Sequence, residues 1–192
     1  ALAAVLYLHH VLVSGQFHLI DEQMTYAQAT VRQGQHHDAF SRLLQACILL
    51  INAQYLALKG QSNQALELLR RVNRLCASVP RQVLTTQPFN DLILPNIIIA
   101  QSYELEGWIQ FELGAFQRAT SRFQQAIKLA RTANDWIVEN RALIGLCHVM
   151  LFGSQYEMIE EQLPHALYVA RAIGDRYGQV LGLRTQALLH AK

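Results

Sequence analysis

The sequence is poor in charge and in proline. Charged residues make up only 16% of the 192 residues, hydrophobic residues make up 52%, and four prolines are present. So little charge with so much apolar material is not the composition of a disordered chain. Few prolines, with abundant Ala, Leu and Gln, favour helix, because unbranched side chains lose little rotamer freedom there. The length suits one ordinary domain or a string of small repeated units.

Lysine and cysteine are also scarce. The chain has 13 Arg but three Lys, and its net charge of +2 is too small to indicate a phosphate-neutralising surface. We therefore expect no direct nucleic-acid binding by this region. The three cysteines, Cys47, Cys76 and Cys147, lie far apart, each within an apolar helical pattern. Their odd number predicts buried thiols in a reducing compartment, which favours a cytoplasmic protein.

The start of the sequence does not have the pattern of a signal peptide. The chain begins ALAAVLYLHHVLV, without Met or a charged leading region, and no small-residue cleavage site follows. No uninterrupted apolar run reaches the roughly 18 to 20 residues that span a bilayer, so we expect no membrane association. The abrupt start and end favour a fragment of a longer protein.

Nearly every segment carries apolar residues at helical spacing, and none shows the sustained alternation of a strand. Short connections with Gly or Asn separate the segments, and glycine ends helices because it adopts the left-handed conformation without a Cβ penalty. The pattern predicts an all-α protein. The expected helices cover residues 1–14, 17–33, 38–59, 63–78, 97–113, 116–132, 136–152, 155–172 and 175–191.

One connection differs from the others. Residues 79–96 hold three of the four prolines and lack a clean helical pattern. We expect an irregular surface loop there, between two sub-bundles.

A repeated unit is visible in the stretch GWIQFELGAFQRATSRFQQA, which begins at Gly107. Its spacing predicts two helices joined at Gly114, with Gly107 packed against Ala119 and with Phe116 and Phe123 filling the groove toward the next pair. The sequence AIKLARTANDW recurs as ALYVARAIGDR after 40 residues. Helix pairs that recur at such a period predict a helical solenoid.

The same stretch resembles a tetratricopeptide repeat. It departs from that pattern at Gln110, where an aromatic residue is usual, and at Arg131, where proline is usual. The resemblance implies a right-handed αα superhelix of about four and a half helix pairs, a single solenoid domain over residues 1–192 that acts in protein–protein interaction. The matching positions are Gly107, Gly114, Phe116, Ala119, Phe123 and Ala126.

Two families use repeats of this kind. The ARxxxD turns at Arg131 and Arg171, and GDRYG at 174–178, are similar to the longer repeat of large bacterial regulators, such as LuxR- and MalT-like transcription activators and signalling ATPases. This resemblance implies a non-catalytic sensor or scaffold region. The stretch ALKGQSNQALELLRRVNRLCASVPR and Pro164 resemble the tetratricopeptide subunit of the cohesin loader, whose repeats wrap a partner segment. Either resemblance implies a protein or peptide partner, including another domain of the same parent chain.

Signatures of chemistry are missing. The sequence contains no GxGxxG, Walker loop, GxSxG or HExxH motif. The histidine pairs at 9–10 and 36–37 are adjacent residues, which point in different directions on a helix and cannot chelate one metal ion. We expect no catalysis, metal or cofactor. The alternative is an enzyme that uses Cys147 and His148, which would need a distant third partner.

The densest basic run is Arg70, Arg71, Arg74 and Arg81, and no aromatic residues are interleaved with it. We expect a solvated helix face, with Arg stems that cover apolar surface, in preference to a nucleic-acid site.

The first helix of each pair lines the concave side in a solenoid of this kind. Glu104, Trp108 and Phe111 share one helical face by their spacing, and a Trp with polar neighbours suits a peptide anchor. Burial of Trp108 between repeats is an equally good interpretation. The residues predicted for the binding face are His9, Gln54, Gln101, Glu104, Trp108, Phe111, Asn140, Arg141 and His148.

Overall fold

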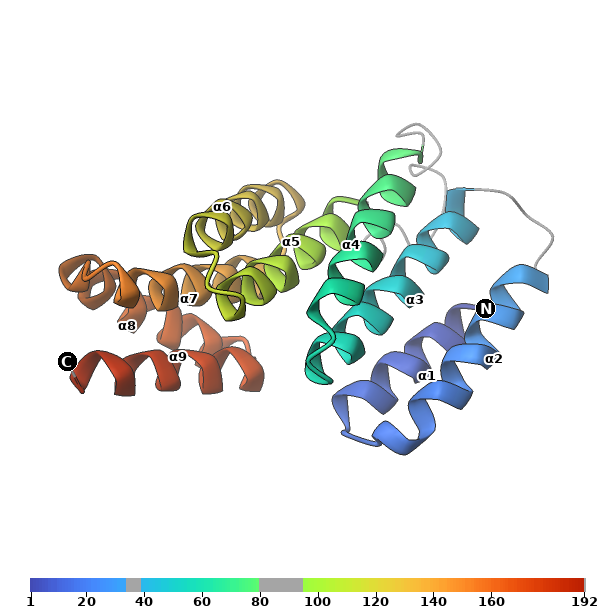
Figure 1. Cartoon of the computed structure of the whole chain (residues 1–192), viewed down its shortest axis with the longest axis horizontal. Helices are drawn as coiled ribbons and strands as arrows, with labels where there is room; N and C mark the ends of the chain where they lie inside the picture. Colours follow the sequence, from blue (N-terminus) through green and yellow to red (C-terminus); the bar gives the residue numbers. More distant parts are fainter. Residues whose placement is uncertain (34–38, 80–94, 192) are drawn as a thin grey trace. The chain divides into compact units, whose positions relative to one another are not determined.

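The computed structural model describes residues 1–33, 39–79 and 95–191, and this part of the chain is helical without a strand. A short 3-10 helix, η1 (Phe17–Leu19), replaces the start of the helix expected at 17–33; the other predicted helices are confirmed to within a few residues. The α-helices are α1 (Leu2–Val13), α2 (Ile20–Gln33), α3 (Ala39–Leu58), α4 (Ser62–Ala77), α5 (Pro95–Glu112), α6 (Phe116–Ala133), α7 (Trp136–Phe152), α8 (Tyr156–Ala172) and α9 (Arg176–His190) (Figure 1).

The loop predicted at 79–96 lies mostly outside the described residues, which omit 80–94. Its last two residues, Pro95 and Asn96, open α5. Proline is well suited to the first position of a helix, because its fixed φ matches the helix and its missing N–H would have no intrahelical partner there.

The described connections between consecutive helices share one backbone geometry. In each, one residue is left-handed and the next donates its N–H to the carbonyl five residues back, as Ala115 does to Gln110 at 2.8 Å. This bond satisfies a carbonyl that the helix end would leave free. At the end of α7 the left-handed residue is Ser154, although the glycine at 153 directly precedes it. The left-handed residues are Gly15, Gly60, Gly114, Asn134, Ser154 and Gly174.

The chain divides into two compact units, unit 1 (residues 1–102) and unit 2 (residues 103–192). Within unit 1, α1 packs against α2 and α3, α2 packs against α3, and α3 packs against α4. Within unit 2, α6 packs against α7, α7 packs against α8 and α9, and α8 packs against α9. In each unit the contacts therefore join helices that are neighbours or next neighbours along the chain (Figure 1).

Phe123 of α6 is the centre of one hydrophobic cluster in unit 2, and its side chain is fully buried. Two glycines make room for its ring: a Cβ added to Gly107 would lie 2.6 Å from the ring, and one added to Gly145 would lie 2.5 Å from it. Ala119 belongs to the same cluster, but the atoms nearest to Gly107 are those of Phe123. Gly107 therefore makes room for the Phe123 ring, where we expected the methyl group of Ala119. Phe116, also expected in the interior, is 39% exposed.

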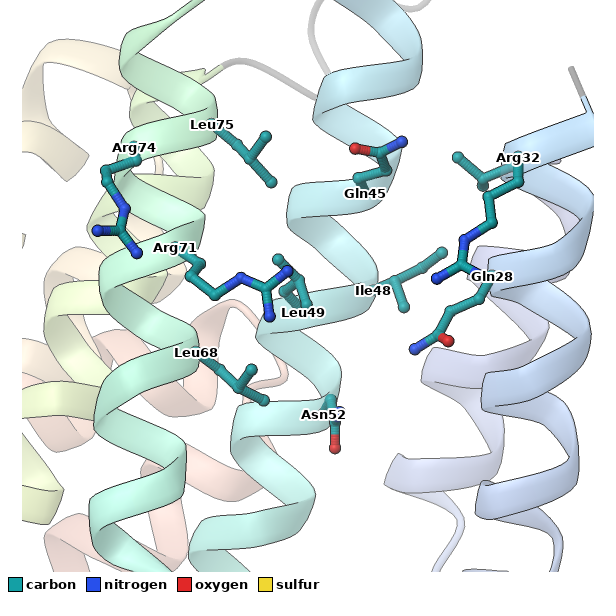
Figure 2. A pocket seen from close by; sticks show the side chains of 11 residues that line it. Gln28, Arg32, Gln45, Ile48, Leu49, Asn52, Leu68, Arg71, Arg74 and Leu75 are labelled. Atoms are coloured by element: carbon teal, nitrogen blue, oxygen red, sulfur yellow. The ribbon is translucent and has the colours of Figure 1, made fainter. Parts of the chain in front are cut away.

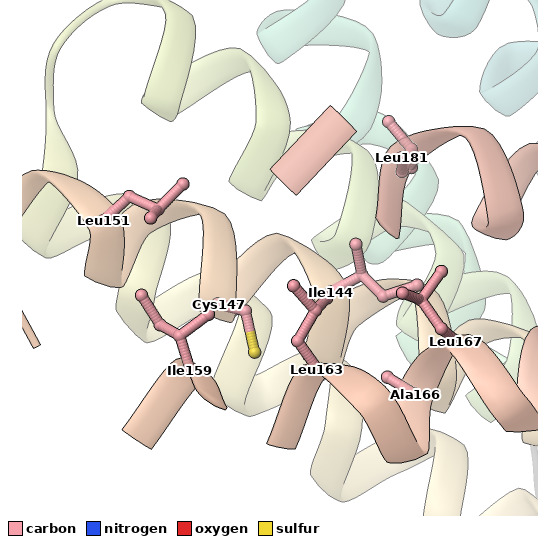
Figure 3. Close-up of a cluster of buried hydrophobic side chains, with 8 residues drawn as sticks. All are labelled: Ile144, Cys147, Leu151, Ile159, Leu163, Ala166, Leu167 and Leu181. Atoms are coloured by element: carbon pink, nitrogen blue, oxygen red, sulfur yellow. The ribbon is translucent and has the colours of Figure 1, made fainter. Parts of the chain in front are cut away.

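A second cluster joins α7 to α8 and α9 (Figure 3). Buried side chains lie on all sides of α7, as expected for a helix that packs against three others. The cluster comprises Ile144, Cys147, Leu151, Ile159, Leu163, Ala166, Leu167 and Leu181.

The helix α3 is mostly apolar, with polar residues such as Gln45 and Asn52 that interrupt its apolar run. Among the described helices it alone has the length and apolar composition for a bilayer crossing, and 44% of that apolar window is buried within the structure. Several of its side chains, including Leu43 and Leu44, belong to the core. Because the core helix of a soluble protein passes the same test, this finding is weak evidence for a membrane span.

Candidate binding site

Buried polar side chains in the described part of unit 2 occur on alternate helices. They lie on α5, α7 and α9, or at the residue before α9, and α6 and α8 bury none. Polar groups taken out of water need hydrogen-bond partners, so the partners of these side chains show how the helices are joined. The buried polar residues of this unit are Glu104, Gln110, Asn140, His148, Asp175 and Thr185.

Glu104 and Trp108 of α5 form the first pair. The Trp108 indole N–H donates a hydrogen bond to Glu104 Oε1 at 3.0 Å. Burial raises the pKa of the Glu104 carboxyl to about 7, although the charge of Arg141 and the bond from Trp108 partly oppose the shift. Near neutral pH the carboxyl is therefore divided between its neutral and its charged form.

Arg141 of α7 forms an ion pair with Asp175, the residue before α9. Its Nε and Nη2 donate to the two carboxylate oxygens of Asp175 at 2.8 and 2.6 Å, and its guanidinium lies 5.0 Å from the Tyr177 ring centroid. Burial alone would raise the pKa of Asp175, but the bonds from Arg141 and from the backbone of Gly178 and Tyr177 lower it below its usual value. This paired geometry ties α7 to α9 and leaves Arg141 little freedom to bind a ligand.

Asn140, the neighbour of Arg141, is buried at 3% exposure. Its Nδ2 has no hydrogen-bond partner within the part of the chain that the structure describes.

His148 of α7 contacts Thr185 of α9, with 3.0 Å between Nδ1 and Oγ1. Thr185 donates its only hydroxyl hydrogen to the Leu181 carbonyl, at 2.9 Å. The Thr185 oxygen must then accept from the ring, so His148 carries its proton on Nδ1. Burial, and to a smaller extent the charge of Arg184, lowers the pKa of His148 to about 4, and the imidazole is neutral at pH 7.

A row of aromatic rings leads from this interior to the surface. Trp108 lies 5.3 Å from Phe123 in an edge contact, and Phe111 lies 4.8 Å from His148. Phe111 also contacts Phe116 and Phe152, at 5.6 and 5.2 Å. At the outer end, Phe116 and Phe152 stack at 5.3 Å with 20° between their planes.

The stacked pair borders a groove on α6, α7 and the turn into α8, with a volume of about 400 Å³. Phe152 is 57% exposed at its edge. The apolar lining comes from Leu146, Val149 and Met150 of α7. The rest of the lining is polar but uncharged: Gln117, Thr120, Gln124 and Gln155. A groove with an apolar floor and amide groups at its rim can hold an apolar side chain and hydrogen-bond the backbone that carries it.

The predicted face is only partly assembled in unit 2. Glu104, Trp108, Phe111 and His148 form one contact network, and Trp108 is half-buried against both clusters. Arg141 influences Glu104 only through its charge. Asn140 of unit 2 is buried and lies outside this network. The remaining predicted residues belong to unit 1: Gln54 and Gln101 are half-buried, and His9 is exposed.

Sequence reasoning missed the partners on other helices. Asp175 is 34 residues from Arg141 and Thr185 is 37 residues from His148, so no local spacing relates them. Phe152 was missed because a Phe near the end of an apolar helix has the same sequence pattern whether its ring is buried or exposed.

Cys147 and His148, the residues of the enzyme alternative, lie in different surroundings. Cys147 is fully buried in the second cluster, and burial raises the pKa of its thiol to about 11. A nucleophilic cysteine needs a lowered pKa, so this shift has the opposite sign from the one that catalysis requires. Cys47 and Cys76 are free thiols as well, with pKa values raised by burial to about 12.

No group of three or more His, Cys, Asp or Glu that could hold a metal ion occurs in the described ranges. No protein-family model matches the chain, and a search of curated proteins returns no significant match.

Proposed function

We propose that the chain is a non-catalytic protein-interaction module, built from tetratricopeptide-like helix pairs stacked in a right-handed superhelix, and that unit 2 binds an apolar peptide segment of a partner protein. The repeated turn geometry and the neighbour-to-neighbour helix packing in each unit support the architecture. The partner segment belongs to another protein or to the remainder of a parent chain, as in the bacterial regulators that the repeats resemble.

The observation that carries the proposal is the exposed Phe116–Phe152 stack beside the uncharged groove. Exposing two large rings to water is unfavourable, at about 25 cal/mol per Å² of apolar surface, and a partner that covers them recovers this free energy. Aromatic residues in partly dry pockets dominate the energetics of many interfaces. Trp108 and Phe111 support the stack from below, through the row of ring contacts.

The groove also defines the chemistry of the peptide. Its lining carries no charge, so a charged partner residue would lose water without gaining an ion pair. The amide groups of Gln117, Gln124 and Gln155 can donate to and accept from a peptide backbone. An apolar residue within an extended backbone fits this arrangement best.

The test selects binders from a random peptide library displayed on phage, and compares their affinities for variants by fluorescence anisotropy. Phe152→Ala should weaken binding by about 2 kcal/mol, because it removes one ring of the stack. The matched control is Tyr168→Ala on α8, a ring that is 68% exposed and outside the groove lining. Equal affinities for Phe152→Ala and wild type, or a library that yields no binder, would reject the site.

A further inference from the structure

Unit 1 contains a second and larger groove, which α2, α3 and α4 line, with a volume of about 580 Å³ (Figure 2). Figure 2 shows Arg71 of α4 reaching Leu49 on one side of α3, and Arg32 of α2 beside Gln28 on the other side of α3. Arg74 of α4 also lines it. This size lies within the range of ligand-binding clefts in proteins, which is about 300 to 1,000 Å³.

The groove has unbalanced positive charge. Arg32 and Arg71 are exposed and have no hydrogen-bond or ion-pair partner among the described residues. Arg74 pairs with Glu67 at 3.5 Å, but Glu67 is shared with Arg70 at 3.2 Å. None of the described lining residues is acidic. The groove therefore presents cationic side chains that nothing within this part of the chain neutralises.

The charged residues of the sequence also give unit 1 an excess of positive charge. Unit 1 contains seven Arg and Lys against five Asp and Glu, whereas unit 2 contains nine of each. The net charge of +2 thus resides wholly in unit 1. Such a field attracts acidic partners to the unit that holds the groove.

The remaining lining indicates a peptide. Gln28, Gln45 and Asn52 supply amide groups that can hydrogen-bond a peptide backbone, and Ile48 and Leu49 supply apolar surface. Among the described residues that line the groove none is aromatic, so they offer no stacking platform of the kind that single-stranded nucleic acids use. Guanidinium groups bind carboxylates in a bidentate manner, which gives both charge and orientation.

We propose that this groove binds a short acidic segment of a partner protein, with carboxylates at Arg32 and Arg71 and an apolar side chain on Ile48 and Leu49 between them. This site is separate from the one proposed in unit 2 and does not depend on it. It differs in chemistry as well, because the unit 2 groove is uncharged and this one is cationic.

The experiment uses the full chain and a fluorescein-labelled peptide, Glu-Glu-Leu-Asp-Glu-Leu-Glu-Asp, with a second peptide in which Gln and Asn replace all the acids. Anisotropy should report binding of the acidic peptide and affinity at least about tenfold weaker for its amide counterpart. The double variant Arg32→Gln/Arg71→Gln should lose about tenfold or more in affinity for the acidic peptide.

Arg70→Gln is the matched control. Arg70 neighbours Arg71 on α4 and is exposed, but it does not line the groove. Its substitution removes one positive charge, where the double variant removes two, and should leave affinity within about twofold of wild type, apart from long-range screening. Circular dichroism should show all variants folded, because Arg32 and Arg71 make no hydrogen bond or ion pair among the described residues and the Arg70–Glu67 pair is exposed.

Three results would overturn the proposal. The first is an equal loss from Arg70→Gln, which would indicate diffuse electrostatic attraction without a site. The second is equal binding of the acidic and the amide peptides, or of neither. The third is tighter binding of a short DNA duplex through the same arginines, which would assign the groove to nucleic acid. Because Phe152→Ala should not affect this binding, failure of either groove is distinguishable from failure of the other.

Discussion

Replacing Glu104 by Gln should stabilise unit 2 at neutral and alkaline pH and have little effect in acid. The pKa of Glu104 is raised from its ordinary 4.5 to about 7 in the fold, with burial as the main cause. Between these values the folded protein binds more protons than the unfolded chain, so stability falls as pH rises through this window. Above pH 7 the buried carboxyl is charged, and the free energy of unfolding is then lower by about 3 kcal/mol than in acid.

Gln removes this cost and keeps the local hydrogen bond. Its amide oxygen can accept from the Trp108 indole N–H as Glu104 Oε1 does. The difference in unfolding free energy between Glu104→Gln and wild type should therefore be small below about pH 4.5, grow with pH, and level off above pH 7 at about 3 kcal/mol. The opposite dependence of His148, whose low pKa makes the fold lose stability as pH falls from 6.5 toward 4, is common to both proteins and cancels.

The assay is urea unfolding followed by tryptophan fluorescence from about pH 4 to pH 8. Both tryptophans, Trp108 and Trp136, lie in unit 2, so the signal reports this unit even if unit 1 unfolds separately. Glu160→Gln is the control, because Glu160 is an exposed carboxylate of α8 in the same unit. A difference that is constant over the whole pH range would refute the reasoning, since it would mean that the fold does not perturb Glu104.

Two further predictions concern the core of unit 2. Gly145→Ala should lower the stability of unit 2 by about 1–3 kcal/mol, because the new Cβ would lie 2.5 Å from the buried Phe123 ring. Gly153→Ala is the control in the same urea assay. It should change the stability little, because the nearest atom to its new Cβ would be 3.6 Å away. Cys147 should resist alkylation by iodoacetamide near pH 8 until the protein is unfolded, because its thiol is buried with a pKa of about 11. Rapid modification of native Cys147, mapped by mass spectrometry, would instead favour the enzyme alternative.

Much of the candidate site on α5 could be predicted, because it depends on one helix. The three- and four-residue spacing of Glu104, Trp108 and Phe111 puts them on one face whatever surrounds the helix. The contacts that define their chemistry come from elsewhere in the chain. The raised pKa of Glu104 comes from its burial in the fold, and the low pKa of His148 comes from burial with a smaller contribution from the charge of Arg184 on α9.

Most helix boundaries and turns follow from the sequence alone, because they are local; the start of the helix expected at 17–33 and the turn at Ser154 are exceptions. Apolar residues at helical period predict each helix, and a left-handed residue closes each described turn through a hydrogen bond that reaches back five residues. Only tertiary structure decided which small residue meets which ring and which arginine meets which acid. The sequence pattern predicted Gly107 against Ala119, whereas the Phe123 ring lies nearest to it, and the pattern left Arg141 without a partner until the fold brought Asp175 to it. The physical reason is distance along the chain: burial and pairing join residues that lie tens of positions apart, where no periodicity relates one to the other.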